Sequence, residues 1–345
     1  MKAVLMYAYG GPHVLQYTDV PDVAPEPGEA LVRMEACGVT HLDLDVRSGV
    51  SRIDFVLPHI LGRDLAGEVI AVNEADWPRI GDKVIAPLQM SCMKASCPFC
   101  STGRDNLCPK RIHPGVSGPG GYREFATFRA DTLRLLPANL NYVEAIASMQ
   151  PYATAWHCLM TTTGVTAGET VLVTGAAGSI GVAVVRMAKL LGARVIAAVG
   201  SDSRLNTVIS AGIPLSNTIN YARDDLSAEA LRITNGKGVD AVIDIVGGKV
   251  FTDAFKALAP DGRLCVVGAH GGESVPLDLL EVFRRQIKIL GSSGYTHEEI
   301  GKVLEMTSDG LLEVPPYETM DLSEAAEAHR RIEARENLGK IVLVP

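Results

Sequence analysis

Residues 171–181 read Val-Leu-Val-Thr-Gly-Ala-Ala-Gly-Ser-Ile-Gly, an apolar strand that runs into a glycine-rich turn and then into a helix. Glycine lacks a Cβ, so at positions 175, 178 and 181 the backbone can turn tightly, approach a phosphate closely and pack the helix on a sheet. Free N–H groups at the helix start then face the anion. The stretch therefore predicts the pyrophosphate site of a dinucleotide, with the cofactor-binding residues Gly175, Ala177, Gly178, Ser179 and Ile180.

The spacing of this turn departs from the commonest dinucleotide fingerprint, because Ala176 stands where Gly-x-Gly-x-x-Gly has its first glycine. Its context supports the prediction. Residues 182–191 have the pattern of a helix that ends at Gly192, and residues 194–199 have that of the next parallel strand. The alternative is an ordinary strand-to-helix turn of an α/β protein.

Length and charge limit the classes of function. With 345 residues the chain is long enough for two domains, since single cores stop growing near ~250–300 residues. A net charge of −8 argues against nucleic acid or an anionic membrane as a partner. No run approaches the ~18 apolar residues of a membrane span, and the N-terminus lacks the apolar region of a signal peptide. We therefore expect a soluble, cytoplasmic protein.

The pattern of predicted secondary structure changes twice along the chain. Residues 1–141 alternate short β-rich segments with turns that contain proline and glycine, which predicts a small all-β or barrel-like unit. From about residue 147, strands and helices alternate as in a doubly wound parallel sheet, with later strands at 239–244 and 262–268. Residues 338–344 are again strand-like and should return to the first unit. The predicted domains are residues 1–146 with 288–345, and residues 147–287.

Four of the seven cysteines are crowded into one short segment, at Cys92, Cys97, Cys100 and Cys108. An odd total and this crowding favour a metal site in a reducing compartment over a disulfide framework. Four thiolates can close a tetrahedron around Zn²⁺ with no open position, so the ion would be structural. The alternative is a loose loop of unmetallated thiols. Cys158 and Cys265 have apolar sequence neighbours and are expected to be small buried hydrophobes.

Taken together, these motifs resemble the medium-chain dehydrogenase/reductase superfamily, which contains zinc alcohol dehydrogenases, quinone oxidoreductases and enoyl- or acryloyl-CoA reductases. The resemblance covers nearly the whole chain. It implies an α/β protein with a GroES-like β-rich catalytic domain and a Rossmann domain, and a catalytic cleft between them. The cysteine lobe has two extra residues between its first two ligands, which leaves the role of Cys92 open. The motifs that carry the resemblance are residues 37–43, residues 61–67, the cysteine lobe, residues 81–84, the glycine turn and residues 339–342.

The catalytic zinc of the zinc alcohol dehydrogenases has no matching ligand set in this chain. Cys37 matches one ligand, but Arg63 stands at the histidine position and Gln150 at the second cysteine position. Neither a guanidinium nor an amide nitrogen is a suitable Zn²⁺ ligand. Leu42 also replaces the serine or threonine that relays the alcohol proton in those enzymes. The resemblance thus favours the quinone and enoyl reductase branch.

In that branch a hydride attacks an activated double bond, and positioned donors stabilise the charge that develops on the carbonyl oxygen. The family alignment offers His41, Arg63 and Tyr152 as catalytic candidates. Each has an alternative role: His41 at the cofactor pyrophosphate, Arg63 in a pair with Asp43 or Asp64, and Tyr152 in simple packing at the domain junction.

The end of the second strand of the cofactor domain indicates which dinucleotide is bound. NAD sites present a carboxylate there to the ribose, but this strand ends Val199-Gly200-Ser201. Ser201 and Arg204 are available to a 2′-phosphate, so NADP(H) is the predicted cofactor. Tyr221 resembles a tyrosine near the same phosphate in quinone reductases. Asp202 is the objection, because its carboxylate could favour NAD.

The remaining site residues come from the resemblance alone. It implies cofactor contacts from Thr154, Val246, Gly268, Ala269 and Lys340. It also implies a substrate pocket in the loops around residues 49–57 and Tyr295. The prediction is an NADPH-dependent reductase of an enone, quinone or enoyl thioester that carries a structural zinc and forms a homodimer or homotetramer. The alternatives are an alcohol dehydrogenase or carbonyl reductase, and a non-catalytic NADPH-binding protein of structural or sensory role.

Overall fold

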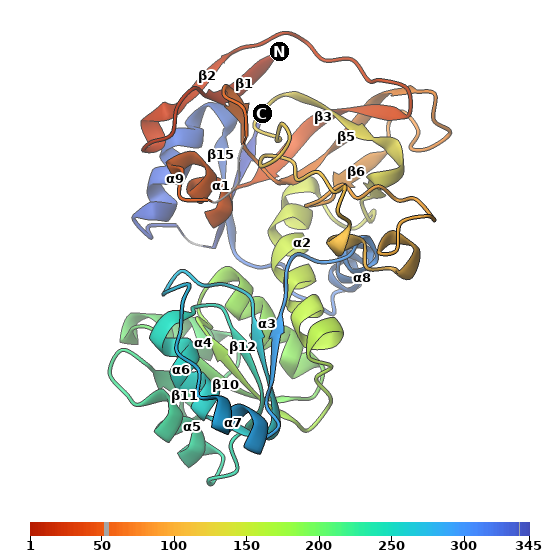
Figure 1. Ribbon diagram of the computed structural model, residues 1–345. Coiled ribbons are helices and arrows are strands. Elements are labelled where there is room, and N and C mark those ends of the chain that lie inside the picture. Colours follow the sequence, from red (N-terminus) through yellow and green to blue (C-terminus); the bar gives the residue numbers. More distant parts are fainter. Residues whose placement is uncertain (52–54, 338) are drawn as a thin grey trace. The chain divides into compact units, whose positions relative to one another are not determined.

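The computed structural model describes residues 1–51, 55–337 and 339–345 (Figure 1). Residues 52–54, which were predicted to lie in a loop at the substrate pocket, and Leu338 of the predicted last strand lie outside the described residues. Contacts divide the chain into two compact units. Unit 1 comprises Met1–Gln150 and Thr296–Pro345, and unit 2 comprises Pro151–Tyr295.

Unit 1 is built on two sheets. Side chains of the long third strand alternate between core and solvent, as expected for a strand with one buried face. Ala30, Val32 and Met34 are buried in the core, while Arg33 faces solvent. The last strand lies beside this third strand, so the end of the chain returns to unit 1 as predicted. The larger sheet has the order β15 (Tyr317–Asp321), β16 (Lys340–Val344), β3 (Glu29–Gly38), β5 (Asp64–Asn73), β6 (Lys83–Ala86) and β8 (Arg134–Leu135), with β7 (Phe125–Arg129) on β3; the smaller joins β2 (Leu15–Asp19), β1 (Lys2–Met6) and β4 (His59–Ile60).

Two helices of unit 1 begin with side-chain caps that the sequence supplies. Thr40 and Asp43 form a capping box at the start of α1, and Thr296 and Glu299 form another at α8. The helices are α1 (His41–Ser48), α8 (His297–Ser308) and α9 (Ala325–Glu333), and α2 (Tyr142–Trp156) crosses the unit boundary. Within the described residues, none of the helices combines the length and apolar character of a membrane span.

A buried polar chain ties α9 to the rest of unit 1. His329 is fully buried; its Nδ1 lies 3.3 Å from Arg47 Nη1, and its Nε2 lies 3.0 Å from the Tyr122 hydroxyl. Arginine can only donate, so Nδ1 accepts and Nε2 carries the hydrogen that it donates to Tyr122. Burial, with the charge of Arg47, lowers the pKa of His329 to about 3.

Acid should therefore weaken unit 1 through His329. Below pH ~6.5 the unfolded chain takes up a proton at this residue that the folded chain refuses, so stability falls as the pH drops toward the folded pKa. Between pH 7.5 and 5 we expect a loss of roughly 2 kcal/mol from this group. Urea unfolding at both pH values measures it. His329→Gln should remove the contribution of this residue, while His113 and His297, whose pKa values burial also lowers to about 4, should still weaken the fold in acid. Replacing the exposed His13 by Gln should leave the pH dependence intact.

Unit 2 is a parallel sheet covered by helices. Its six strands have the order β11-β10-β9-β12-β13-β14, and every pair is parallel, so the predicted doubly wound sheet is confirmed. The chain moves outward from β9 through β10 to β11 and then resumes at β12 on the other side of β9. Ligands of such sheets bind at the carboxyl ends of the strands where the order reverses. The strands are β9 (Thr170–Thr174), β10 (Arg194–Val199), β11 (Thr218–Asn220), β12 (Val239–Asp244), β13 (Leu258–Val266) and β14 (Lys288–Gly291); the helices are α3 (Ser179–Leu190), α4 (Leu205–Ser210), α5 (Leu226–Ile233), α6 (Gly248–Lys256) and α7 (Leu279–Arg284).

Two boundaries in unit 2 differ from the predicted ones. Helix α3 starts at Ser179 rather than at residue 182, because Gly178 has the extended conformation of an N-cap and the helix begins inside the glycine turn. Strand β14 pairs with β13 in the parallel sheet, so this sheet extends past residue 287.

Candidate functional site

The glycine turn joins β9 to α3 at the point where the strand order reverses. Gly175 has a left-handed φ of +61°, which favours glycine. Gly178 is the N-cap of α3 and provides no side chain to bond the first N–H groups of the helix. These groups, those of the predicted cofactor residues Ser179 and Ile180 among them, are the kind of donors that hold a phosphate.

The other two glycines of the turn have different steric roles. A Cβ on Gly181 would lie 2.3 Å from the Gly175 carbonyl oxygen and 2.7 Å from the Ala176 backbone, so the close contact of helix and turn requires glycine. A Cβ on Gly178 would meet only the Gly175 oxygen, at an ordinary 3.4 Å. The fold therefore leaves open space beside Gly178, which a ligand can approach.

Sequence reasoning missed a polar bridge beside this turn. The Thr174 hydroxyl donates to Asp244 Oδ1 at 2.5 Å, and both residues are fully buried at the carboxyl ends of β9 and β12. The second oxygen of Asp244 accepts from the Gly247 N–H at 3.0 Å, and Thr174 accepts from the Ile245 N–H at 3.1 Å. Burial raises the pKa of Asp244, against the hydrogen bonds that it accepts. Two polar residues that each end an apolar strand were the signal that could have found it.

Three residues that the family resemblance predicts to contact the cofactor, Val246, Gly268 and Ala269, lie at the same edge of the sheet as the glycine turn. A Cβ on Gly175 would lie 3.1 Å from the side chain of Val246, which follows β12. The loop after β13 packs on this segment: a Cβ on Gly268 would meet the Ile245 oxygen at 2.6 Å, and Gly247 lies against Ala269. The turn after β9 and the loops after β12 and β13 thus form one edge.

At the end of β10, Asp202 is held by two neighbours. The Arg223 guanidinium lies 3.0 Å from Oδ1 of Asp202, and the Asn220 amide donates to the same oxygen at 2.9 Å. Among the residues that the structure describes, no ion pair involves Arg204, which is half-exposed. Tyr221 covers Gly200, since a Cβ there would lie 2.9 Å from the Tyr221 hydroxyl oxygen. The Ser201 hydroxyl bonds that of Ser203 at 2.9 Å.

Two further candidates of unit 2 lie on α2 and are buried. The hydroxyl of Tyr152, fully buried, accepts from Arg186 Nη1 at 3.3 Å. Thr154 is 7% exposed. The Tyr152 hydroxyl is thus bound to a cation, which was not foreseen.

The other catalytic candidates belong to unit 1. His41 is exposed and is the first residue of α1. Arg63 is buried, and its charge, after burial, is the next largest factor that lowers the pKa of His113 to about 4. Fully buried Asp43 accepts from the Thr40 hydroxyl at 2.6 Å and from the Gly62 N–H at 3.1 Å. Burial raises its pKa, although the bond from Thr40 and the charge of Arg63 act in the opposite direction.

Lys340 is placed in this buried group rather than at the surface. Its ammonium forms an ion pair with fully buried Asp64 and is itself nearly buried. The stem of Lys340 packs on Gly38, where a Cβ would lie 2.4 Å from Cε. Lys340 was predicted to reach the cofactor phosphates; the structure gives its charge a partner within unit 1.

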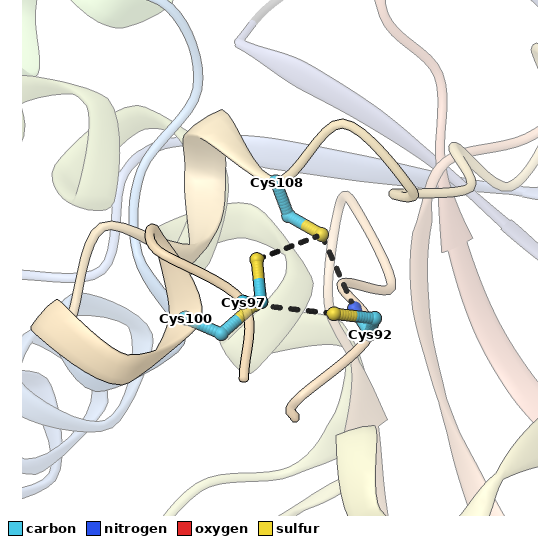
Figure 2. Close-up of side chains that lie close together, drawn as sticks. All are labelled: Cys92, Cys97, Cys100 and Cys108. Atoms are coloured by element: carbon cyan, nitrogen blue, oxygen red, sulfur yellow. Dashed lines mark hydrogen bonds between the residues drawn. The ribbon is translucent and has the colours of Figure 1, made fainter. Parts of the chain in front are cut away.

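The four cysteines of the lobe point toward a common centre (Figure 2). All four sulfur atoms, that of Cys92 included, lie within 4.8 Å of one another. Cys92 Sγ lies 3.7 Å from Cys100 Sγ, and Cys97 Sγ lies 4.0 Å from Cys108 Sγ. A zinc–sulfur bond of ~2.3 Å gives sulfur separations of about 3.8 Å in a tetrahedron, so the residues fit this ion.

The surroundings of the lobe act in opposite directions on two of its thiols, since burial raises the pKa of Cys100 to about 12. Backbone N–H groups of Cys100 and Phe99 lower the pKa of Cys97 to about 7. The N–H of Cys92 donates to Cys108 Sγ at 3.4 Å. Such donors stabilise the ligand form of sulfur that a metal needs.

Known protein families match the chain in two separate segments. Residues 26–138 match the alcohol dehydrogenase GroES-like domain, which confirms the predicted β-rich domain type, and residues 179–309 match the zinc-binding dehydrogenase family. An alcohol dehydrogenase of Geobacillus stearothermophilus is 31% identical over 99% of this chain and 98% of its own length. A quinone oxidoreductase of Sus scrofa is 28% identical over 100% and 98%, respectively. A solved structure of an NAD-dependent alcohol dehydrogenase superposes with a TM-score of 0.92 at 38% identity and full coverage of both chains.

Proposed function

Because the chain belongs to the medium-chain dehydrogenase/reductase superfamily, near its quinone oxidoreductase branch, and is an oxidoreductase, we propose that it reduces an activated carbon–carbon double bond with NADPH. The observation that carries the proposal is buried Arg63, which stands at the position of a zinc-binding histidine in the resemblance. The neighbouring Asp64 has Lys340 as its counter-ion. The position of a zinc-binding histidine thus carries a permanent positive charge, which supports a reaction that needs no catalytic zinc.

The chemistry assigned to the protein is electrostatic. Bound NADPH supplies the hydride that adds to the β-carbon of an enone, quinone or enoyl thioester. Arg63 is the first candidate to stabilise the oxygen that gains charge, because a guanidinium keeps its charge and offers five N–H donors. His41 and Tyr152 remain the other candidates for this role and for proton return. The Gly175–Gly181 turn is proposed to bind the pyrophosphate, with Thr154, Val246, Gly268 and Ala269 as further contacts.

A panel of substrates tests the proposal. NADPH oxidation is followed with enones, quinones, enoyl-CoA thioesters, aldehydes and ketones under the same conditions. The proposal expects turnover in the first three classes, and Arg63→Met should reduce it by about two orders of magnitude. Turnover of aldehydes or ketones alone would favour the second candidate, a carbonyl reductase, which the 38% identity to an NAD-dependent alcohol dehydrogenase supports. NADPH binding without any turnover would favour a structural or sensory role.

The pairing of Asp202 supports NADP(H) as the cofactor. Arg223 and Asn220 hold the carboxylate that an NAD site would turn toward the ribose. We predict that Arg204→Ala raises the KM for NADPH about tenfold, because a charge-assisted bond to the 2′-phosphate is lost, and leaves the KM for NADH nearly unchanged. Arg223→Ala is the matched variant, since it removes the ionic partner of Asp202, leaves only the Asn220 hydrogen bond and should improve the use of NADH. Equal catalytic efficiencies with the two cofactors in the wild type would contradict the assignment.

The cysteine lobe is proposed to hold one structural Zn²⁺. Metal analysis of the purified protein should find about one ion per chain, because no open position or second complete ligand set accompanies the lobe among the described residues. Cys97→Ser should lose this ion. Cys37→Ser, which alters the one cysteine that matches a catalytic ligand, should retain it. About two ions per chain would overturn the zinc-free mechanism.

The assembly is proposed to be a homodimer or homotetramer. Strand β14 lies at the edge of the parallel sheet, and Ile289 on it is 39% exposed. On α7, Leu279 and Phe283 are 69% and 63% exposed. An edge strand beside exposed apolar side chains favours pairing with a second copy. Light scattering of the purified protein measures the state. All seven cysteines are described, and none of them forms a disulfide, which agrees with the proposed reducing, cytoplasmic location.

A further inference from the structure

The cysteine lobe carries a carboxylate that reaches a helix far away in the sequence. Asp105 lies in the short 3-10 helix Asp105–Leu107, between the third and fourth cysteines, and is 8% exposed. Both of its oxygens accept from the His297 N–H, Oδ2 at 3.1 Å and Oδ1 at 3.3 Å. This contact within unit 1 joins the lobe to α8, which lies beside it in Figure 1.

Asp105 completes the cap of α8 from outside the helix. His297 is the first residue of α8, so its N–H has no partner within the helix. The helix caps itself only in part: the Thr296 hydroxyl accepts from the Glu299 N–H at 3.2 Å, and Glu299 accepts from the Thr296 N–H at 2.7 Å. A carboxylate at this end also meets the positive end of the helix dipole. The Arg134 guanidinium packs over Gly301 of the same helix. Its positive charge opposes the repulsion between the carboxylates of Asp105 and Glu299.

The position of Asp105 depends on the last cysteine of the lobe. The Cys108 N–H donates to the Asp105 carbonyl at 3.0 Å, so the turn that presents the carboxylate ends at a metal-site thiol. An ion that holds Cys108 against Cys97 also holds this turn. Thr296, the N-cap of α8, is the residue at which the chain re-enters unit 1.

We infer that a metal ion in the four-cysteine lobe fixes the start of α8 through Asp105, which acts as a positioning residue. Binding of the metal ion by the lobe is then coupled to the ordering of the first turn of α8, where the chain re-enters unit 1. The structural ion thereby has a defined target outside its own loop. Asp105 holds that target by a hydrogen bond and touches neither the ion nor a substrate.

Hydrogen exchange of the full-length protein tests this inference. Wild-type protein loaded with Zn²⁺ is compared with protein stripped by a chelator and a thiol reagent, and deuterium uptake is followed by mass spectrometry in peptides that cover residues 296–302. Removal of the ion should speed exchange there roughly tenfold, as expected for a lost charge-assisted cap. Asp105→Ala should show the fast exchange with the ion still bound, and removal of the ion should add little. Asp105→Asn keeps one acceptor oxygen and should restore most of the protection.

A matched variant separates this effect from general loosening. Asp225 caps α5 in unit 2, where it accepts from the Ala228 N–H at 3.0 Å. Asp225→Ala should speed exchange in α5 and leave the response of α8 to the ion unchanged. The inference is overturned if α8 is indifferent to the ion, if Asp105→Ala responds as fully as the wild type, or if the protein takes up no Zn²⁺. Exchange requires no turnover, so this outcome is independent of the proposed reductase activity.

Discussion

Gly181→Ala should destabilise unit 2 by about 3 kcal/mol and abolish NADPH binding. The added Cβ would lie 2.3 Å from the Gly175 carbonyl oxygen and 2.7 Å from the Ala176 backbone. These are backbone atoms of a tight turn, and unlike the tip of a flexible side chain they cannot rotate away. Relief requires that α3 move off the end of β9, which displaces the N–H groups proposed to bind the phosphates. Urea unfolding and a fluorescence titration with NADPH measure the two effects.

Gly178→Ala is the matched control for this substitution. Gly178 has a negative φ, and its added Cβ would make only a 3.4 Å contact, so we expect a stability loss below about 1 kcal/mol. The methyl group would nevertheless fill the space proposed for the pyrophosphate. Its Kd for NADPH should therefore rise by at least about tenfold, although the fold survives. Unchanged affinity would show that the ligand does not approach this glycine.

Lys340→Met should cost unit 1 about 3–5 kcal/mol. It leaves the carboxylate of Asp64, which is fully buried, without its counter-ion. A second change, Asp64→Asn, removes the stranded charge, so the double variant should regain much of the loss. The unfolding free energy of the three variants measures this coupling directly.

The control for Lys340 is a lysine in a solvent-exposed pair. Lys2 lies 2.8 Å from Asp19, but their side chains are 41% and 80% exposed. Lys2→Met should therefore change the stability by less than about 1 kcal/mol. If Lys340→Met costs no more than this, the ion pair with Asp64 is not the dominant interaction of that lysine. NADPH titration of the double variant then tests the predicted phosphate contact apart from stability.

Local features of the chain were well predicted from the sequence. Strands β9, β10 and β12 are apolar runs bounded by glycine or polar residues, and their parallel pairing follows from the helices between them. The cysteine cluster was also predictable, since its four ligands occupy one short segment and need no distant partner. The predicted start of α3 was too late. The helix contains Gly181 in its first turn, and glycine has a low helix propensity, so the sequence pattern there does not indicate a helix.

Contacts across long stretches of sequence could not be predicted. Lys340 and Asp64 are 276 positions apart, and Asp105 and His297 are 192 apart. No periodicity records such a meeting, because it depends on how strands and lobes pack after they have formed. The pairing of Asp202 with Arg223 likewise depends on β10 and β11 lying side by side. The position of Asp202 after a strand therefore could not show whether its carboxylate is available to a ribose.

The bridge between Thr174 and Asp244 has a consequence for the redesign of cofactor preference. It clamps the ends of β9 and β12, while the loop after β10, from Gly200 to Arg204, takes no part in it. The residues proposed to bind the pyrophosphate and those proposed to discriminate the adenosine ribose thus depend on different side-chain hydrogen bonds, although β10 itself pairs with β9. An exchange of residues 200–204 for a loop that suits NADH would therefore leave every hydrogen bond of the Thr174–Asp244 bridge in place.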